Sequence, residues 1–424
     1  MRPLSKPTDS LTHPLTHSPI HRLTDSPSFL PYGHQYIDDE DIEAVVEVLK
    51  SDFLTQGPKV KEFEDRLAEY CGAKYAVAVS NGTAALFLVS KILLNPGDKV
   101  LTTPNSFVAT SNSILLAGAK PVFVDIKSDG NIDLDKCIEV LKSDRDIKAL
   151  YVVHFSGNPV DLEKLAFIRE KYGVKIVEDA AHALGAKYTI GNSTYKIGSC
   201  EFSDAAIFSF HPVKNITIGE GGAILTNDEN IYEKLLMLRS HGITKDPNRF
   251  THSPIHQFTN SPTHPFTDSP PLWYYEMQDL SHNFRITDFQ CALGVSQLKK
   301  LDFFVEKRRE IALRYEQLLQ DTPFRPLYKF NENSAYHLYV VRADFSKMNI
   351  SKSELFLKMK EKGIGLQLHY IPINKQPYYQ KLGYGNENLP EMYRYYEEAF
   401  SLPIFVGLTD EEQEYVVECL KNSL

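Results

Sequence analysis

A lysine, an aspartate and a histidine stand at positions where an α/β protein could use them for chemistry. Lys214 lies between the apolar run AIFSF and the glycine-rich turn GEGG, and in a desolvated pocket its amine could form an imine with an aldehyde. Asp179 ends the segment VKIVED and could hold a protonated ring nitrogen through a charge-assisted hydrogen bond. His182 follows three residues later and could face the same ligand. The ordinary alternatives are a surface lysine, a helix cap and a structural histidine.

The segment SNGTAAL, Ser80 to Leu86, could bind a phosphate. Gly82 permits close approach, Thr83 offers a hydroxyl, and free amides at the start of a helix attract anions. Asn81 or Thr83 could instead only cap the helix. The spacing matches neither GxxxxGK[ST] nor GxGxxG, which disfavours a nucleotide hydrolase or a Rossmann dehydrogenase.

Two further polar positions belong to this set. Ser209 lies beside Lys214 and could supply a second phosphate donor, because it ends the same apolar strand. Asn283 and Arg285 precede a long helical pattern that Thr287 or Asp288 can cap. A capped helix with an exposed arginine is the simpler interpretation of that last segment.

The elements that must position these residues alternate between strand and helix. Two helices come first, one capped by Asp38 or Asp39 and one that Gly72 can end. From YAVAVS to GGAILTND, short apolar strands are separated by helices, which predicts a mostly parallel sheet covered on both faces. Ligands bind beyond the carboxyl ends of such strands, where the chemical segments fall.

A smaller α/β unit should follow the sheet. A helical pattern runs from Thr287 toward Leu319, and strands are expected at 336–345 and 365–370 around a helix at 352–363. The fold class is α/β, with a large, mostly parallel sheet domain and a smaller C-terminal domain. The expected boundaries are a tail at 1–29, the large domain at 30–300 with an insertion at 247–270, and the small domain at 301–424.

Two repetitive tracts interrupt the globular pattern, at 8–27 and 251–270. Both repeat Thr, His, Ser and Pro with a beat of four, which suits neither a strand nor a helix and contains many helix-breaking prolines. Six of the fourteen histidines lie there, so metal binding is one interpretation. A low-complexity tail and a tolerated loop insertion is the interpretation we favour.

Composition limits the class of protein. The 424 residues carry 46 basic and 55 acidic side chains, a net charge of −9, which disfavours nonspecific binding to nucleic acid. The apolar runs are too short to span a bilayer, and no signal peptide is visible at the N-terminus. The five cysteines are widely spaced, without a CxxC pair, so we expect a reducing cytoplasm and neither a disulfide framework nor a metal site.

Taken together, the phosphate turn, Asp-x-x-His, SFHPVK and NFRITDFQ resemble, in that order, the DegT/DnrJ/EryC1/StrS family of sugar aminotransferases. The resemblance covers 31–246 and 271–424 and implies fold type I with pyridoxal 5′-phosphate as cofactor. It implies catalytic roles for Lys214, which would form the imine with the cofactor, for Asp179 at the pyridine nitrogen, and for His182 near the 3-hydroxyl. The remaining cofactor-binding residues that it implies are Thr83, Ala84 through its amide, and Ser209 at the phosphate, Phe107 stacked on the ring, and Asn283. Asn283 would reach the cofactor phosphate of a neighbouring subunit, which implies a homodimer.

A narrower resemblance concerns the substrate. TTPNSFVATSN, WYYEMQ and GIGLQLHYIPI are similar to the branch of the family that serves pseudaminic acid biosynthesis. It implies a UDP-linked 4-keto-6-deoxy-N-acetyl hexosamine as amino acceptor and glutamate, converted to 2-oxoglutarate, as donor. Two alternatives stay open: an aminotransferase for another nucleotide keto sugar (dTDP-, GDP- or other UDP-linked), and a noncatalytic regulator that retains the fold.

Overall fold

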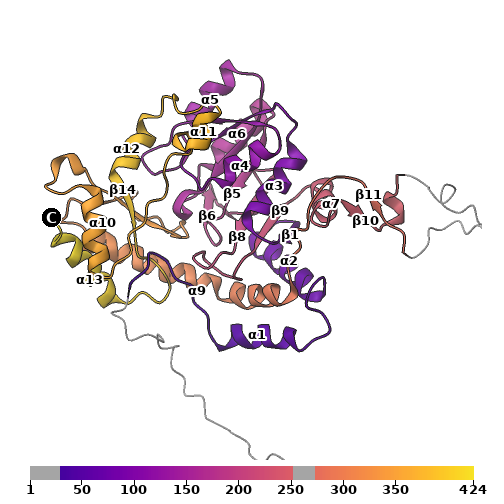
Figure 1. The fold of residues 1–424 in the computed structure, drawn as a ribbon, viewed down its shortest axis with the longest axis horizontal. Helices are drawn as coiled ribbons and strands as arrows, with labels where there is room; N and C mark the ends of the chain where they lie inside the picture. The colour runs from indigo at the N-terminus through magenta and orange to yellow at the C-terminus, as the bar shows by residue number, and fades with distance from the viewer. Residues whose placement is uncertain (1–28, 252–272) are drawn as a thin grey trace, which may run out of the picture.

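The computed structural model describes residues 29–251 and 273–424, and its centre is a seven-stranded sheet (Figure 1). The strand order is β1-β9-β8-β5-β4-β2-β3. Every pair in this sheet is parallel except the two that β9 makes, so the expectation of a mostly parallel sheet is confirmed. The strands are β1 Tyr75–Val79, β2 Lys99–Thr102, β3 Lys120–Phe123, β4 Ile147–Val153, β5 Lys175–Asp179, β8 Ala205–Ser209 and β9 Gly222–Thr226.

Helices cover both faces of this sheet because its strands point apolar side chains alternately to each side. Within β4, Leu150 and Val152 join one buried cluster, and Ala149 and Tyr151 join the other. The first cluster contains residues of α2, α5, α6 and α9, and the second contains residues of α3, α4 and α7. The helices before α9 are α1 Asp39–Leu49, α2 Pro58–Cys71, α3 Gly82–Leu93, α4 Ala109–Leu116, α5 Leu134–Ser143, α6 Leu162–Tyr172 and α7 Glu229–Leu238.

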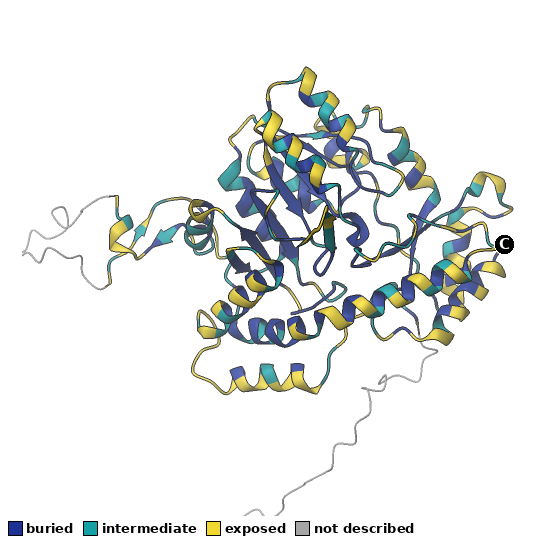
Figure 2. Ribbon diagram, turned by 180° about the vertical axis from the view of Figure 1, so that it is seen from behind, coloured by how far each residue is buried: buried dark blue, intermediate teal, exposed yellow. Residues whose placement is uncertain are grey.

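The two predicted N-terminal helices are present, but α1 buries few of its apolar side chains. Asp38 caps α1, and Gly72 ends α2 in the left-handed conformation, as the sequence indicates. Ile42 and Leu49 are nevertheless 43% and 54% exposed, and α1 lies on the outside of α9 (Figure 2). The buried residues of α1 are Val48 and Asp41, and the Asp41 carboxylate accepts a hydrogen bond from Gln297 Nε2 at 2.7 Å.

The C-terminal part begins with α9 Asp288–Leu318, whose capping box at Thr287 fulfils the predicted helix start. The second half of α9 packs into a separate core with α10, α13 and a three-stranded sheet. Leu30 belongs to this core and pairs with the chain on both sides of Ile364: its amide donates to Gly363 O at 2.7 Å and its carbonyl accepts from Gly365 N at 2.8 Å. The elements are β12 Arg325–Pro326, β13 Tyr339–Arg342, β14 Ala399–Leu402, α10 Lys352–Glu361, α11 Pro377–Lys381, α12 Pro390–Glu398 and α13 Asp410–Lys421.

One predicted strand of this part is wrong and one is shorter than expected. The segment 365–370 forms no strand; only Gln367 pairs, in an isolated bridge with Ser401 of β14. The reason is that residues 367–370 line the main cavity of the protein instead of continuing along β14. The strand expected at 336–345 is β13, limited to Tyr339–Arg342, because the residues before it dock onto the large sheet domain.

The insertion leaves the large domain through a small two-stranded arm. β10 Ile243–Thr244 pairs antiparallel with β11 Glu276–Met277, so the two ends of the inserted chain lie side by side (Figure 1). The repetitive tracts themselves lie outside the described residues, apart from Thr251. A second hairpin, β6 Lys187–Ile190 with β7 Ser193–Lys196, and the short 3-10 helices at 155–157, 247–249, 345–347 and 373–375 complete the fold. Among the helices of residues 29–251 and 273–424, none is long and apolar enough to cross a membrane.

Candidate active site

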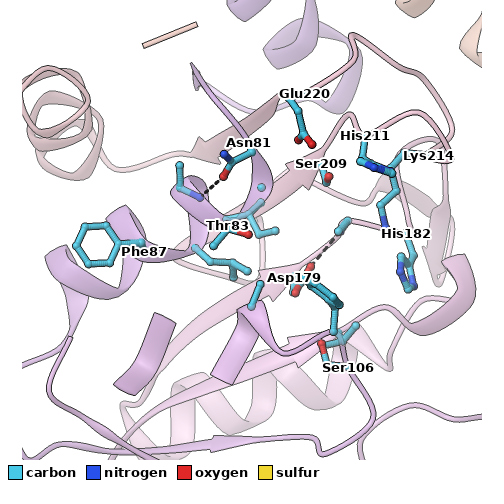
Figure 3. Close-up of a pocket in the computed structure, with 18 of the residues that line it drawn as sticks. Asn81, Thr83, Phe87, Ser106, Asp179, His182, Ser209, His211, Lys214 and Glu220 are labelled. Carbon is cyan, nitrogen blue, oxygen red and sulfur yellow. Dashed lines mark hydrogen bonds between the residues drawn. The ribbon is translucent and has the colours of Figure 1, made fainter. Parts of the chain in front are cut away.

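A cavity of about 1240 Å³ opens beyond the carboxyl ends of the parallel strands (Figure 3). Every site residue predicted from the sequence lines it: Thr83, Ala84, Phe107, Asp179, His182, Ser209, Lys214 and Asn283. Figure 3 shows Asn81 and Thr83 on one side, Lys214 and His182 on the other, and Ser209 between them. The antiparallel β9 explains this gathering in part, because the chain between β8 and β9 turns back at the cavity end of the sheet and carries Lys214.

The turn before α3 has the features of an anion site. Asn81 caps the helix, and its Oδ1 accepts a hydrogen bond from Ala84 N at 2.8 Å. The predicted amide of Ala84 is therefore already engaged, whereas the amides of Gly82 and Thr83 meet no acceptor in the described chain. Two free amides at the positive end of a helix, with the hydroxyls of Thr83 and Ser209 beside them, can hold a phosphate.

Glycines bring the backbone segments of this turn together. A Cβ atom on Gly82 would lie 3.0 Å from Ser209 Cβ, and one on Gly222 would lie 2.5 Å from the Asn81 carbonyl group. The end of β8, the start of β9 and the first turn of α3 can approach this closely only without those side chains. The sequence predicts that Gly82 permits close approach at a phosphate site, whereas it does not single out Gly222.

Asp179 is the buried anion of the cavity, with 5% of its surface exposed at the end of β5. Its carboxylate accepts hydrogen bonds from Thr110 Oγ1 at 2.6 Å and from Ala181 N at 3.2 Å. Burial raises the pKa of Asp179, and the two donors oppose that shift. A carboxylate held in this way has a remaining lone pair that can take a cationic donor within the cavity.

Lys214 is the one lysine on the cavity wall formed by the described residues. Burial lowers the pKa of its amine to about 8, while the charge of Asp179 acts in the opposite direction. Its Nζ makes a single contact, 3.4 Å from His337 Nε2, and no carboxylate of the described chain pairs with it. An amine of this kind is close to the protonation balance that a nucleophile or a proton carrier needs at neutral pH.

His182 is held in one neutral tautomer. Its Nδ1 accepts a hydrogen bond from Ser156 N at 3.3 Å, so the ring proton is on Nε2, which lies 3.1 Å from Tyr370 Oη. Burial, with the nearby positive charge of Lys214 acting in the same direction, lowers the pKa of His182 well below 6.5. The ring can therefore present an uncharged polar edge at the cavity.

Phe107 and Asn283 lie on the wall without a close polar or stacking partner of the expected kind. Phe107 is 59% exposed, and its nearest ring is Tyr370, 6.4 Å away between centroids. Asn283 lies on the wall of its own chain's cavity, with its Oδ1 accepting from Arg285 N at 3.1 Å. The stacking of Phe107 and the reach of Asn283 into a neighbouring subunit stay predictions.

Sequence reasoning missed the residues that the C-terminal part contributes. His369 and Tyr370 line the cavity, and His337 contacts Lys214 from behind. Burial lowers the pKa of His369 to about 3, and its Nδ1 is 2.8 Å from Ser401 Oγ. The histidines within YHLYVV and LQLHY were the available signal, but no spacing rule joins them to Lys214. In the described ranges, no three His, Cys, Asp or Glu side chains gather to hold a metal ion.

The sheet order and a lysine on the turn after β8, facing an aspartate at the end of β5, define an α/β transferase of fold type I. The family model of the DegT/DnrJ/EryC1/StrS aminotransferase family matches residues 35–421, and the chain belongs to this family. Aminotransferases of this family depend on pyridoxal phosphate. The chain is thus an enzyme of the aminotransferase class, as the sequence resemblance implied.

Individual relatives cover almost the whole chain. It is 38% identical to a UDP-4-amino-4,6-dideoxy-N-acetyl-beta-L-altrosamine transaminase of Campylobacter jejuni over 93% of this chain and 97% of that protein. The identity and both coverages are the same for the spore coat polysaccharide biosynthesis protein SpsC of Bacillus subtilis. The solved structure of Helicobacter pylori PseC, an aminotransferase of pseudaminic acid biosynthesis, superposes with a TM-score of 0.82 at 33% identity and covers 93% of this chain and 99% of that one.

Proposed function

We propose that this chain transfers an amino group from glutamate to a UDP-linked 4-keto-6-deoxy-N-acetyl hexosamine, with pyridoxal 5′-phosphate as cofactor. The observation that carries the proposal is the single cavity on which Lys214, Asp179 and the turn before α3 converge. The similarity to the Campylobacter jejuni transaminase over nearly the whole chain supports this substrate class.

The residues of the cavity fit pyridoxal phosphate. Gly82 and Thr83 offer free amides to a phosphate, and the absence of a Cβ on Gly82 and Gly222 lets Ser209 and the turn before α3 lie close together. Asp179 has a free lone pair for the ring nitrogen, and Lys214 has an amine that no carboxylate pairs with. Hydrogen-bond donors for the phosphate, a carboxylate for the ring nitrogen and an amine for the aldehyde are the groups that this cofactor requires.

Each residue has a role that follows from its contacts. When bound, pyridoxal phosphate supplies an electron sink for the electron pair left on the substrate carbon. Asp179 would keep the ring nitrogen protonated, and Thr110 and Ala181 hold its carboxylate in place for this. Lys214 Nζ, once free, would take the proton from the glutamate α-carbon and deliver it on the other side of the reacting bond system. His182 would orient the cofactor ring through the Nε2–H edge of its imidazole.

The relatives and the size of the site support the proposed acceptor. A cavity of about 1240 Å³ exceeds the usual range of about 300–1,000 Å³ for small-ligand sites, in keeping with a cofactor and a nucleotide sugar together. The equal similarity to SpsC supports, as the second candidate, transfer to another nucleotide keto sugar. Assaying UDP-, dTDP- and GDP-linked keto sugars with glutamate separates the two.

We also propose that the working unit is a homodimer with shared sites. Glutamate and a diphosphate sugar bring several negative charges, yet Lys214 is the one lysine or arginine on the wall built by the described residues. A second chain would supply the missing cations and, through Asn283, a contact to the cofactor phosphate. Light scattering, and activity restored by mixing an inactive Lys214 variant with an inactive Asn283 variant, test this.

Location and domain division are extensions of the same proposal. All five cysteines are buried and unpaired, which supports the expected cytoplasm. Residues 30–300 and 301–424 remain our division into large and small domains, although α9 runs across the boundary and Leu30 packs with the small domain.

The proposal is tested at Lys214. Lys214→Ala should lose multiple turnover and covalent retention of the cofactor after borohydride reduction, with a melting temperature close to that of the unmutated protein, because the amine makes one long polar contact, with His337. Lys214→Arg should not restore activity, since a guanidinium stays protonated. Repeated turnovers in the Ala variant, or a reduced cofactor attached elsewhere, would sink the assignment.

A further inference from the structure

His337 lies behind the cavity wall, where it contacts Lys214 and packs against the ring of His182, 4.4 Å away between ring centroids. Its Nε2 is 3.4 Å from Lys214 Nζ, and the side chain is fully enclosed. Its other ring nitrogen, Nδ1, has no partner among the described residues. Because Lys214 Nζ in turn has no other partner there, the two side chains are each other's single polar contact.

The segment that carries His337 is docked firmly onto the large sheet domain. Ala335 N donates to Gly157 O at 3.0 Å, and Leu338 N donates to Ser156 O at 3.3 Å. Gly157 has a φ of +95°, and a Cβ there would lie 2.9 Å from Tyr336 N, so the backbones of the two segments are in contact. These bonds fix the segment of His337 relative to the large sheet domain.

Arg308 of α9 supports the same segment from the other side. Its buried guanidinium donates to the carbonyl oxygens of Tyr336, His337 and Ile404 at 3.3, 3.3 and 3.1 Å. No carboxylate of the described chain pairs with it, so these carbonyls are what hold the charge. The backbone of His337 is thereby clamped between the large domain and the helix that joins the two halves.

We propose that His337 is a positioning residue for Lys214: its neutral Nε2 accepts a hydrogen bond from the ammonium formed when Lys214 takes up the substrate proton. The proposal rests on the proposed aminotransferase function. In the step concerned, a carbon–hydrogen bond of the substrate breaks, a nitrogen–hydrogen bond forms on Nζ, and the electron pair stays with the bound substrate and cofactor. An ammonium has only donors, so Nε2 must be the acceptor and the ring proton must be on Nδ1.

The other groups around the amine cannot replace this contact. Asp179 uses its oxygens for Thr110 and Ala181 and makes no hydrogen bond to Lys214. Arg308 is positive and lies on the far side of His337, where its charge opposes protonation of the imidazole. The titratable groups that face the pair from the surrounding elements are Asp179, His182, His369 and Tyr370. Burial keeps the two histidines neutral and the tyrosine protonated, so they leave His337 as the acceptor.

Three substitutions separate an acceptor role from a packing role. His337→Gln can place an amide oxygen near the position of Nε2, His337→Asn is too short and reaches only that of Nδ1, and His337→Phe fills the space without an acceptor. The first readout needs no turnover: the cofactor-free full chain is labelled with formaldehyde and cyanoborohydride across pH 6–10, and the modification of Lys214 is followed by mass spectrometry. The second readout is kcat and KM for glutamate in the reconstituted enzyme.

We expect Phe and Asn to shift the labelling midpoint of Lys214 down by about one pH unit, the effect of losing one hydrogen bond to a charged group. kcat should fall by about 10- to 100-fold with KM for glutamate nearly unchanged, and Gln should recover most of both quantities. Unchanged labelling in folded Phe and Asn variants would overturn the proposal, as would equal loss in Gln and Phe. A shifted midpoint without any transaminase activity in the unmutated chain would leave the contact established and overturn the proposed function instead. If Phe unfolds, the Gln and Asn pair decides alone, since both keep a polar amide.

Discussion

At the scale of single residues, Asp179 offers the sharpest separation between binding and chemistry. Asp179→Asn keeps a side chain that can hydrogen-bond to Thr110 but removes the charge that would hold a protonated ring nitrogen. We expect cofactor occupancy to stay near that of the unmutated protein, with kcat reduced by at least about 100-fold, as for loss of a main electrostatic contact. Absorbance titration with pyridoxal phosphate and steady-state rates measure the two quantities. A fully loaded variant with nearly normal rates would contradict the electron-sink role.

The sequence predicted the cavity residues at the ends of the sheet strands better than those of the C-terminal part. Lys214, Asp179 and Ser209 each follow an apolar strand, and parallel strands bring such ends to one edge, so local sequence sufficed. His337 and His369 are near Lys214 only because the C-terminal part docks through Gly157 and Asn215. No local periodicity encodes that docking, and the histidines therefore carried no readable signal.

At the scale of elements, the junction of α2 and α9 depends on one carboxylate. Asp288, in the first turn of α9, accepts hydrogen bonds from Gly57 N at 2.7 Å and Lys59 N at 3.0 Å at the start of α2. Asp288→Ala would leave both amides without an acceptor and should lower the free energy of unfolding by about 2 kcal/mol. Asp288→Asn keeps one acceptor and should lose about half of that. Chemical denaturation measures both, and an Ala variant within about 0.5 kcal/mol of the unmutated protein would refute this role.

Elements with capping signals were the most predictable ones. Asp38, Gly72 and Thr287 each act at the helix end where the sequence places them. The strand predicted at 365–370 is absent because residues 367–370 line the cavity. Within this segment, Gln367 alone pairs with a sheet strand, at Ser401. Alternation of apolar and polar residues indicates that the two faces of a segment have different surroundings, but it does not indicate whether a neighbouring strand is present.

At the scale of the whole molecule, acid should destabilise the fold through its buried histidines. Burial lowers the pKa of His369 from 6.5 to about 3 and those of His182 and His337 well below 6.5. Below about pH 6.5 these histidines are therefore protonated in the unfolded chain and neutral in the folded chain. The free energy of unfolding consequently falls as the pH falls toward 3. Each such histidine contributes a slope of up to about 1.4 kcal/mol per pH unit.

Unfolding free energies between pH 7.5 and 5 test this slope. His369→Gln should flatten it relative to the unmutated protein, because one proton uptake is removed from the unfolded state. An identical slope in the two proteins would show that other groups govern acid stability.

The repetitive insertion should be dispensable for folding. β10 and β11 pair at the base of the arm, so the chain ends at Thr244 and Glu276 are already held together without the tract at 251–270. Replacing 251–270 by a short Gly-Ser linker should leave the melting temperature and cofactor binding unchanged, since loop closure costs little. A modest change in KM for the sugar substrate is compatible with this, because the arm leads into the wall at Asn283. Unfolding or loss of cofactor on deletion would make the tract a packed element.

The pairing of Leu30 with Gly363 and Gly365 has a consequence for the order in which parts of the protein can fold during synthesis. On the ribosome, Leu30 emerges long before its partners Gly363 and Gly365. The residues of the large sheet are made first, whereas the small core that contains Leu30 can close only after the chain up to Leu420 has been made. Because His337 and Tyr370 also emerge late, a nascent chain carries its lysine without the groups that surround it. A product that ends before these residues would therefore lack a complete pocket.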